Sequence, residues 1–396
     1  MRGEGGGVVG EPVIVSAVRT AVARVGGGLA PLQAHQFGAV VLRAALERAG
    51  VDGAEVDDVI LGNVLSGGGN IARLTALEAG LPVTVPGMTV DRQCGSGLQA
   101  IVLAAALIRA GQGRIYLAGG TESMTRAPFL MERPAQAFPR TPPRFLRFQL
   151  APEAIGNPPM GITAENVAAR YGISREEQDA FALESHRRAV RAQGAGDFDD
   201  EIVPVPVPTG KGQAAFFARD EHPRPDTSLE KLAALPPVFK EGGTVTAGNS
   251  CGINDGAAAV VVMDAAEAER RGLRPLGRIL GWAVAGVDPN YMGMGPVPAT
   301  RKVLEATGVR LEDLDQIELN EAFAAQALAC IRELGLDPER VNPDGGAIAL
   351  GHPLGATGAI LVTKLLGGLR RRGGRLGLVT ACIGGGQGIA ALIERL

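Results

Sequence analysis

Two stretches far apart in the chain repeat the same order of patterns, and this repetition limits the folds open to it. Residues 95–120 and 355–381 each run from a glycine-rich turn through a long apolar helix pattern and a basic, glycine-rich turn to a strand pattern. Around them, short apolar runs alternate with helical patterns, which is the rhythm of a parallel sheet covered by helices. The sequence therefore predicts an α/β fold with two duplicated halves. Such alternation also occurs in unrelated folds, and that is the alternative to duplication.

Apolar runs and helical periodicity place the expected elements along the chain. Strand patterns cover 13–17, 58–62, 87–91, 114–119, 278–286, 316–320, 375–381 and 388–394, and helical patterns cover 35–49, 72–79, 322–333 and the stretches that open near 95, 298 and 355. Residues 121–243 are richer in proline and charge and contain one clear helical stretch, Arg175 to Arg191. Ser174 and Glu177 form a capping-box pattern before it. We expect this region to be a long excursion that covers a site.

Composition excludes several classes of protein. The chain has 396 residues, of which 46% are hydrophobic and 20% charged, so a folded protein of two or three domains is expected rather than a disordered one. The net charge of −3 gives no overall attraction to nucleic acid. No apolar run reaches the ~18 residues of a membrane-spanning helix. The first twelve residues lack the apolar core of a secretory signal and are expected to be a frayed tail.

The cysteines and histidines show no metal-binding or redox spacing. Four of each are present, and no C-x-x-C pair occurs among the cysteines. Reduced thiols in a cytoplasmic protein without a metal ion are the simplest interpretation.

Three glycine-flanked segments each present one reactive side chain. Cys94 follows a strand pattern and precedes a helix, whose N-terminus is expected to lower the pKa of the thiol and to offer N–H groups to an oxyanion. His352 could act as its base, and Cys382 is a second thiol able to move a proton on a carbon acid. Together they predict an acyl-transfer enzyme. The alternatives are a buried structural thiol, a solvated histidine and a plain turn.

Two further motifs leave alternatives open. The GSGLQA segment that follows Cys94 matches a dinucleotide-binding fingerprint, which would make the protein a nicotinamide-dependent oxidoreductase. The acidic residue expected about 20 positions later is missing, which weakens this interpretation. Asn320 follows a strand pattern and could be a helix N-cap or could hold a water in an active site.

Seven segments taken together carry a resemblance to a known family. They are QCGSGLQA around Cys94, GGTESMTRAP at 119–128, MGITAENVA at 160–168, GTVTAGN at 243–249, NEAFAAQA at 320–327, GGAIALGHPLGATGA at 345–359 and CIGGGQG at 382–388. In this order and over nearly the whole length, the chain resembles the thiolases, which are acetyl-CoA acyltransferases.

The resemblance implies a layered α-β-α-β-α fold with two five-stranded mixed-sheet halves. Residues 8–120 and 244–271 would form the N-terminal half, 272–396 the C-terminal half, and 121–243 an inserted loop domain that binds coenzyme A. A homodimer or homotetramer is also implied. Coenzyme A enters as substrate and product, and no other cofactor is needed.

The family's roles transfer to matching positions. Cys94 would take the acyl group as a thioester, His352 would activate it, and Cys382 would move the α-proton of the second acetyl-CoA. One oxyanion hole would combine His352 with a water on Asn320, and the other the N–H groups of Cys94 and Gly384. The implied contacts with the acyl-CoA are Met160, Arg224, Phe239, Ser250, Cys251 and Phe323.

The resemblance predicts an acetyl-CoA C-acetyltransferase, because Met160 favours small acyl groups by analogy. A degradative 3-ketoacyl-CoA thiolase for longer chains is the nearest alternative, and a decarboxylating synthase and a silent coenzyme A-binding relative are others. Three positions depart from the family: Pro159 replaces a common histidine, Cys251 a common serine, and Asp91 a common asparagine.

Overall fold

The computed structural model describes residues 10–66, 69–138, 141–209 and 214–396, so the predicted frayed tail lies mostly outside the described residues. The N-terminal half of the fold, called the first half below, contains β1 (Pro12–Arg19), β2 (Ala23–Arg24), β3 (Asp58–Gly62), β4 (Gly87–Val90), β5 (Ile115–Ser123) and β8 (Asn254–Asp264). The second half supplies β9 (Gly277–Gly286), β10 (Gln316–Leu319), β11 (Leu376–Ile383) and β12 (Gln387–Arg395).

The strand order shows the duplication directly. In the first half the order is β4-β3-β5-β8-β1, and in the second half it is β10-β11-β12-β9. The two halves share a parallel pair, β3 with β5 in the first and β10 with β11 in the second. The next two pairs along the sheet are antiparallel: β5 with β8 and β8 with β1, and β11 with β12 and β12 with β9. In the first half β4 pairs in parallel with β3 at the edge of the sheet. At the equivalent edge of the second half there is only a single parallel bridge, from Val341 to Ile317 of β10. Among the described residues the second half thus has four strands and a single bridge, instead of the five strands expected.

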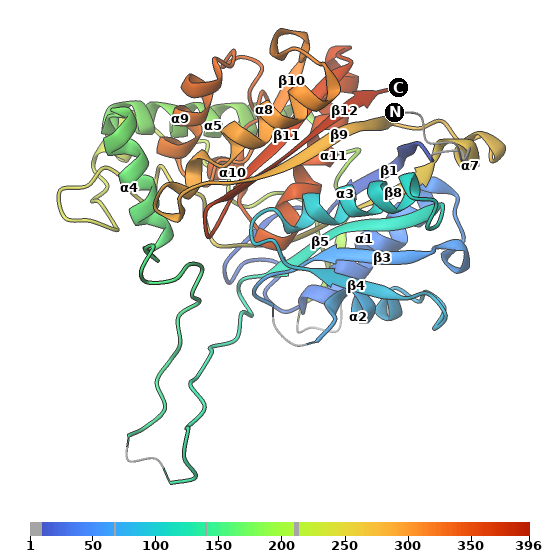
Figure 1. Ribbon diagram of the computed structural model, residues 1–396, viewed down its shortest axis with the longest axis horizontal. Helices are drawn as coiled ribbons and strands as arrows, with labels where there is room; N and C mark the ends of the chain where they lie inside the picture. The colour runs from blue at the N-terminus through green and yellow to red at the C-terminus, as the bar shows by residue number, and fades with distance from the viewer. Residues whose placement is uncertain (1–9, 67–68, 139–140, 210–213) are drawn as a thin grey trace.

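Helices and sheets stack in five layers. One outer layer is α1 (Ala34–Ala49) and α2 (Ile71–Glu78), the central layer is α3 (Ser96–Arg109) and α11 (Leu354–Arg372), and the other outer layer is α8 (Pro296–Thr307) and α9 (Ala324–Leu334) (Figure 1). Two pairings between β1 and β9 join the halves edge to edge. The layered α-β-α-β-α architecture is therefore confirmed.

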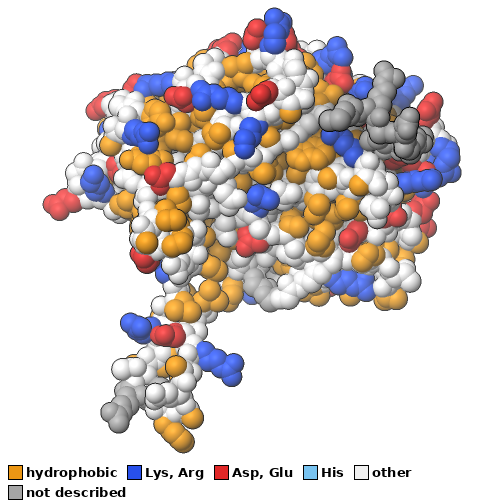
Figure 2. Space-filling view, in the orientation of Figure 1, with side chains coloured by type: hydrophobic (Ala, Val, Ile, Leu, Met, Phe, Trp, Pro, Cys, Tyr) orange, Lys and Arg blue, Asp and Glu red, His pale blue; other side chains and the backbone are white. Residues whose placement is uncertain are grey.

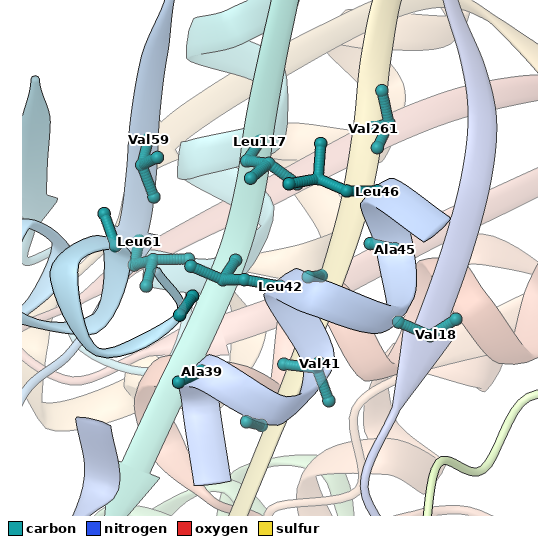
Figure 3. Packing of buried hydrophobic residues seen from close by; sticks show 14 of the residues in the cluster. Val18, Ala39, Val41, Leu42, Ala45, Leu46, Val59, Leu61, Leu117 and Val261 are labelled. Carbon is teal, nitrogen blue, oxygen red and sulfur yellow. The ribbon is translucent and has the colours of Figure 1, made fainter. Parts of the chain in front are cut away.

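The outer face of the first sheet shows how burial fixes the helices. Leu42 and Leu46 of α1 lie over Leu61 of β3, Leu117 of β5 and Val261 of β8 (Figure 3). All five side chains are buried. Burying such a side chain contributes about 1.5–3 kcal/mol, so this contact holds α1 on the sheet.

The excursion between β5 and β8 has more regular structure than expected. The predicted helix and its Ser174–Glu177 capping box are confirmed in α5 (Arg175–Ala195). Beyond this one clear helical stretch, α4 (Met160–Tyr171), α6 (Leu229–Ala233) and the hairpin of β6 (Val205–Pro208) with β7 (Ala214–Phe217) are also present. Elements of four or five residues are too short to show a periodicity.

An arm between β5 and α4 projects away from the body (Figure 1). Its two branches pair at Met131 and Phe145, and it exposes large apolar side chains (Figure 2). Phe129 is 89% exposed and Phe138 91% exposed. Exposed apolar surface of this kind marks an interaction site.

The remaining elements are short: α7 (Ala265–Arg270), α10 (Ala347–Leu350) and the 3₁₀ turns Gly53–Glu55, Pro289–Met294 and Leu311–Asp313. No helix in the described part of the chain is long and apolar enough to cross a membrane.

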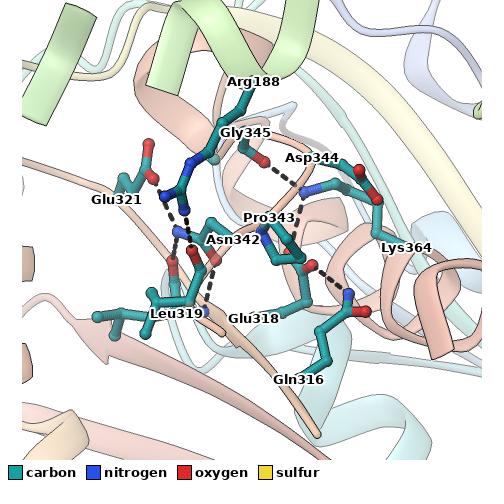
Figure 4. A network of polar contacts seen from close by, with 12 residues as sticks. Arg188, Gln316, Glu318, Leu319, Glu321, Asn342, Pro343, Asp344, Gly345 and Lys364 are labelled. Carbon is teal, nitrogen blue, oxygen red and sulfur yellow. Dashed lines mark hydrogen bonds and ion pairs between the residues drawn. The ribbon is translucent and has the colours of Figure 1, made fainter. Parts of the chain in front are cut away.

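A buried ion pair joins α11 to β10. Lys364 Nζ donates to Glu318 Oε2 at 2.9 Å and to the Gly345 carbonyl at 2.6 Å, and Gln316 donates to the other carboxylate oxygen at 2.9 Å (Figure 4). Both charged side chains are at most 2% exposed. Glu318 is thus satisfied only while Lys364 is present.

Replacement of Lys364 by methionine is expected to lower the free energy of unfolding by about 3–5 kcal/mol, because it leaves Glu318 buried without its cation. Urea unfolding at neutral pH measures the loss. The double variant Lys364→Met with Glu318→Gln should recover part of it, and Arg310→Met, which breaks an exposed pair with Asp313, should cost under about 1 kcal/mol. A loss from Lys364→Met no larger than that from Arg310→Met would contradict the assigned role.

Candidate active site

The starts of α3 and α11 lie against each other in the central layer, and each follows a predicted catalytic residue. A β-carbon at Gly97 would lie 2.8 Å from the Gly355 carbonyl oxygen, and one at Gly358 would lie 2.2 Å from the Leu98 nitrogen. Close packing therefore explains both glycines of the GSG segment without a dinucleotide: Gly97 faces α11, and a β-carbon at Gly95 would lie 2.6 Å from Ile383. This packing brings Cys94 and His352 to adjacent helix starts.

Cys94 is half-buried and stands one residue before Gly95, the N-cap of α3. Burial raises the pKa of its thiol to about 11, although the N–H groups of Gly384 and of Cys94 itself oppose the shift. The expectation that the helix N-terminus lowers this pKa is wrong, because burial outweighs it. The group is a thiol at neutral pH and needs a base before it can attack.

The turn before Cys94 is strained and held by Asp91. Gln93 has φ of +45°, which is uncommon for a residue with a side chain, and its N–H donates to Asp91 Oδ1 at 2.7 Å. An asparagine oxygen could accept the same bond. The departure at Asp91 therefore preserves the local turn.

His352 is 3% exposed, and its tautomer follows from its neighbours. Thr357 Oγ1 donates to the Pro353 carbonyl at 2.9 Å, so it accepts a hydrogen bond from His352 Nδ1 at 2.7 Å. This leaves Nε2 without a proton. Burial lowers the pKa of His352 to about 4, so the imidazole is neutral and Nε2 is a free proton acceptor at neutral pH.

Asn320 contacts this histidine and does not cap a helix. Its Nδ2 lies 3.4 Å from His352 Nε2, and its fully buried Oδ1 has no hydrogen-bond partner among the described residues. Helix α9 begins at Ala324 with Phe323 as N-cap, so the N-cap alternative for Asn320 is wrong. A water on the unpartnered Oδ1 would sit beside the histidine.

Cys382 is fully buried near the end of β11, in an apolar cluster with Met160, Val245, Met292 and Phe323. Burial raises the pKa of its thiol well above the usual value, and Cys94 is near enough to raise it further. The packing of Ile383 against Gly95 also brings the two segments together. The two thiols therefore lie close together, with Cys94 half-buried and Cys382 fully removed from bulk water.

Gly384 lies where the turn after Cys382 meets α4. A β-carbon there would lie 3.0 Å from Leu150 Cδ1 and 3.6 Å from the Met160 sulfur. Met160 is the first residue of α4, with Pro159 at the N-cap position. Leu150 and Met160 thus form a wall beside the N–H of Gly384.

Phe239 and Phe323 extend this wall. Their rings meet edge to face at 6.2 Å between centroids. A β-carbon at Gly161 would lie 2.1 Å from the Phe239 ring, so only glycine fits there.

Ser250 and Cys251 lie on a loop that pairs with the segment before α9. Ser250 Oγ donates to the Thr246 carbonyl at 2.7 Å, and the Cys251 N–H donates to the Ala322 carbonyl at 3.0 Å. The serine hydroxyl is thus engaged within its own loop. Burial, with Cys94 nearby, raises the pKa of Cys251 to about 12, so this group is a protonated thiol at neutral pH.

Arg224 borders a basic cavity of about 240 Å³ between α5 and the loop that precedes α6. Its N–H donates to His186 Nδ1 at 3.2 Å, and Arg187 and Arg191 line the same cavity. Burial lowers the pKa of His186 to about 4, so the positive charge comes from the arginines. Such a cavity fits a phosphate-bearing group.

Three contributors to the site were missed from sequence. Thr357 sets the histidine tautomer, and Asn254 Oδ1 accepts from the His352 N–H at 2.9 Å. Buried Glu122 accepts from the Gly355 N–H at 3.0 Å and from the N–H groups of 64–66, which ties β5 to the start of α11. Of the three, only Thr357 could have been suspected from the sequence, because it lies one helical turn after His352. The contacts of Asn254 and Glu122 join residues that are 98 and 233 positions apart.

Replacement of Thr357 by valine is expected to lower kcat by about 10–100-fold with little change in KM, because Nδ1 loses the acceptor that fixes its tautomer. Steady-state kinetics measure both constants, and Thr357→Ser should retain most of kcat. An equal fall in the serine and valine variants, or a change in KM alone, would refute this positioning role.

No group of three or more His, Cys, Asp or Glu side chains suited to a metal ion occurs among the described residues. The site consists of thiols, a neutral imidazole, an amide and backbone N–H groups. This set suits acyl transfer with a carbanion step.

Comparison with known proteins agrees with this chemistry. Residues 12–266 match the family model described as thiolase, N-terminal domain, and residues 273–395 match thiolase, C-terminal domain. An acetyl-CoA acetyltransferase of Escherichia coli K12 is 52% identical over 391 residues, covering 97% of this chain and 99% of that protein. A beta-ketoadipyl-CoA thiolase of Pseudomonas aeruginosa is 50% identical over 400 residues, covering 98% and 99%. The crystal structure of Bacillus anthracis acetyl-CoA acetyltransferase matches with a TM-score of 0.93 at 44% identity, covering 98% of this chain and 99% of that one.

Proposed function

Because the chain belongs to the thiolase family of acyltransferases and has its fold, we propose that it is an acetyl-CoA C-acetyltransferase, which condenses two acetyl-CoA molecules to acetoacetyl-CoA and catalyses the reverse thiolysis. The observation that carries the proposal is the arrangement of bulky side chains at Cys382. Met160, Met292 and Phe323 crowd this thiol, and Leu150 closes the side next to Gly384. Such walls favour a short acyl group over a long one.

In the first half-reaction His352 Nε2 takes the proton of Cys94, whose sulfur attacks the thioester carbon of acetyl-CoA. The carbonyl oxygen becomes an oxyanion, and donors at this position contribute about 3 kcal/mol each. We assign these donors to the N–H groups of Cys94 and Gly384. The departing coenzyme A sulfur takes the proton of Cys382, which leaves Cys382 as a thiolate.

In the second half-reaction that thiolate removes the α-proton of another acetyl-CoA. The enolate oxygen lies at His352 and a water on Asn320, and the carbanion attacks the acetyl group on Cys94. The Cys94 sulfur leaves and recovers its proton from His352, so every group returns to its starting state. All protons are then accounted for without an external base.

The coenzyme A contacts are assigned to the loop domain predicted for residues 121–243. The basic cavity at Arg224 would hold the nucleotide phosphates. His222 connects it to the thiols, because a β-carbon at Gly252, next to Cys251, would lie 2.3 Å from the His222 ring. The pantetheine chain would pass along this line, by Cys251 and Ser250, toward Cys94.

A homodimer or homotetramer is also proposed, with the apolar arm as one of its contacts. A cytoplasmic location for the protein is also proposed, because its four cysteines are free thiols.

A degradative 3-ketoacyl-CoA thiolase is the second candidate. The beta-ketoadipyl-CoA relative is nearly as similar as the acetyl-CoA acetyltransferase, and Pro159 replaces the histidine that the resemblance predicts beside the thioester.

The test compares kcat/KM for thiolysis of acetoacetyl-CoA and of a long-chain 3-ketoacyl-CoA. We expect a preference for acetoacetyl-CoA of at least about tenfold, and a smaller preference in Met160→Ala, which removes part of the wall. A preference for the long chain would select the second candidate. Activity on neither would reject both.

A further inference from the structure

A second cavity lies apart from the candidate active site. Its volume is about 400 Å³, and it is lined by the middle of β1, the C-terminal half of α11, the end of α1, the segment before β9, the end of β12 and the loop after α5. None of the residues assigned to catalysis or acyl-CoA contact lines it. Its size lies within the range of small-molecule sites.

The cavity carries an excess of arginines. Five arginine and three acidic side chains line it. Arg370 pairs with Asp200 at 2.5 Å, and Arg371 pairs with Asp344 at 2.7 Å. Across the described residues, the other three have no carboxylate partner: Arg48, Arg274 and Arg395. Three guanidinium groups without a counterion favour an oxyanion of more than one charge, which indicates phosphate rather than a single carboxylate.

Polar atoms without a partner lie at the same cavity. Ser16, which is 2% exposed, and Glu201, which is 5% exposed, each have an oxygen without a hydrogen-bond partner in the described chain. Arg371 Nε makes no hydrogen bond either, but it forms an ion pair with Asp197 Oδ1 at 3.7 Å. A β-carbon at Gly367 would lie 3.1 Å from Glu201 Oε2 and 3.1 Å from Arg371 Nη1, so the absence of a side chain there leaves room beside this carboxylate at the wall of the cavity. Buried polar atoms are rarely unpaired, and the two unpartnered oxygens of Ser16 and Glu201 beside one cavity point to a ligand that supplies the partners.

These groups define the chemistry of that ligand. Glu201 Oε2 can only accept, so the ligand must offer an O–H or N–H group. Val15, Leu276 and Leu366 give the cavity an apolar wall for a carbon frame.

We propose that this cavity binds a phosphate monoester of a small polyol. The phosphate is held by Arg48, Arg274 and Arg395, and a free hydroxyl group binds Glu201 and Ser16. The site is independent of the proposed acetyl transfer, because it shares no residue with that machinery.

The test is isothermal titration of the full chain, saturated with coenzyme A, with glycerol 3-phosphate. Saturation keeps the probe out of the cavity at Arg224. We expect one binding event, at least tenfold weaker in the double variant Arg274→Gln with Arg395→Gln. The charge-matched variant Arg301→Gln with Arg310→Gln, on a distant surface, should bind as the parent does. Thermal unfolding of each variant checks that it is folded.

Two further titrations separate the parts of the proposal. Inorganic phosphate should bind more weakly than glycerol 3-phosphate, and Ser16→Ala should weaken only the ester. Equal binding of the two probes would overturn the hydroxyl assignment and leave free phosphate as the ligand. No binding of either probe, or equal loss in both double variants, would overturn the site.

Discussion

Replacement of Cys94 by alanine is expected to abolish transfer of an acetyl group to the protein and to lower kcat/KM for thiolysis by at least about a thousandfold. The N–H of Gly384 and that of Cys94 itself both favour the Cys94 thiolate, whereas Cys251 and Cys382 each have only their own N–H for this purpose. Cys94 also stands one residue before the N-cap of α3, and the start of this helix packs against the start of α11, the helix that follows the neutral imidazole of His352. Intact-mass measurement after incubation with acetyl-CoA detects the acyl group.

The matched control is Cys251→Ser, which restores the residue expected from the resemblance and should still become acetylated. A Cys94→Ala protein that gains an acetyl group would show that the nucleophile is misassigned. Failure of both variants to fold would be visible in their thermal unfolding, which separates loss of structure from loss of chemistry.

Replacement of Cys382 by alanine is expected to affect the second half-reaction and not the first. The protein should still accept an acetyl group on Cys94, whereas condensation should fall by about a hundredfold to ten-thousandfold, because the α-proton has no base. The apolar cluster at Cys382 loses only a sulfur atom, so the fold should persist. Mass measurement reports the first step, and formation of acetoacetyl-CoA reports the second.

Cys330 provides the control for this variant. It is also fully buried and lies near enough to Cys382 to raise its pKa, but its sulfur contacts the Gly293 carbonyl at 3.2 Å and has no assigned role in the reaction. Cys330→Ala should retain both half-reactions. Equal condensation rates in the Cys382 and Cys330 variants would remove Cys382 from the mechanism.

Several features of the fold and the site could be predicted from local patterns. The repeated order of glycine turn, helix and strand in 95–120 and 355–381 predicted two related halves. In the structure α3 begins at Ser96 and α11 at Leu354, so the glycines of both segments lie at the helix starts. Helix starts follow from glycine, proline and apolar periodicity within a few residues. This is why Cys94, His352 and Cys382 could be placed at element ends before the structure was known.

The excursion was harder, because its elements are short and its packing partners are distant. Helix α4 starts at Met160 directly after two prolines, and its buried face packs against the turn at Pro289–Met294 and against α9, more than a hundred positions away. Helix α6 has five residues, and strands β6 and β7 have four residues each. Such elements depend on tertiary contacts more than on their own sequence.

The sequence by itself determined the order of the elements, the duplication and the identity of three reactive side chains, because these depend on patterns within a short stretch of chain. Only the tertiary structure decided the protonation states and neighbours of those side chains. Burial made Cys94 a thiol and His352 a neutral imidazole, and contacts between distant segments gave Asn320 its place at the histidine instead of a helix cap. The physical reason is that a pKa, a tautomer and a hydrogen-bond partner depend on the groups that surround a side chain in space, and folding brings those groups together from all parts of the chain.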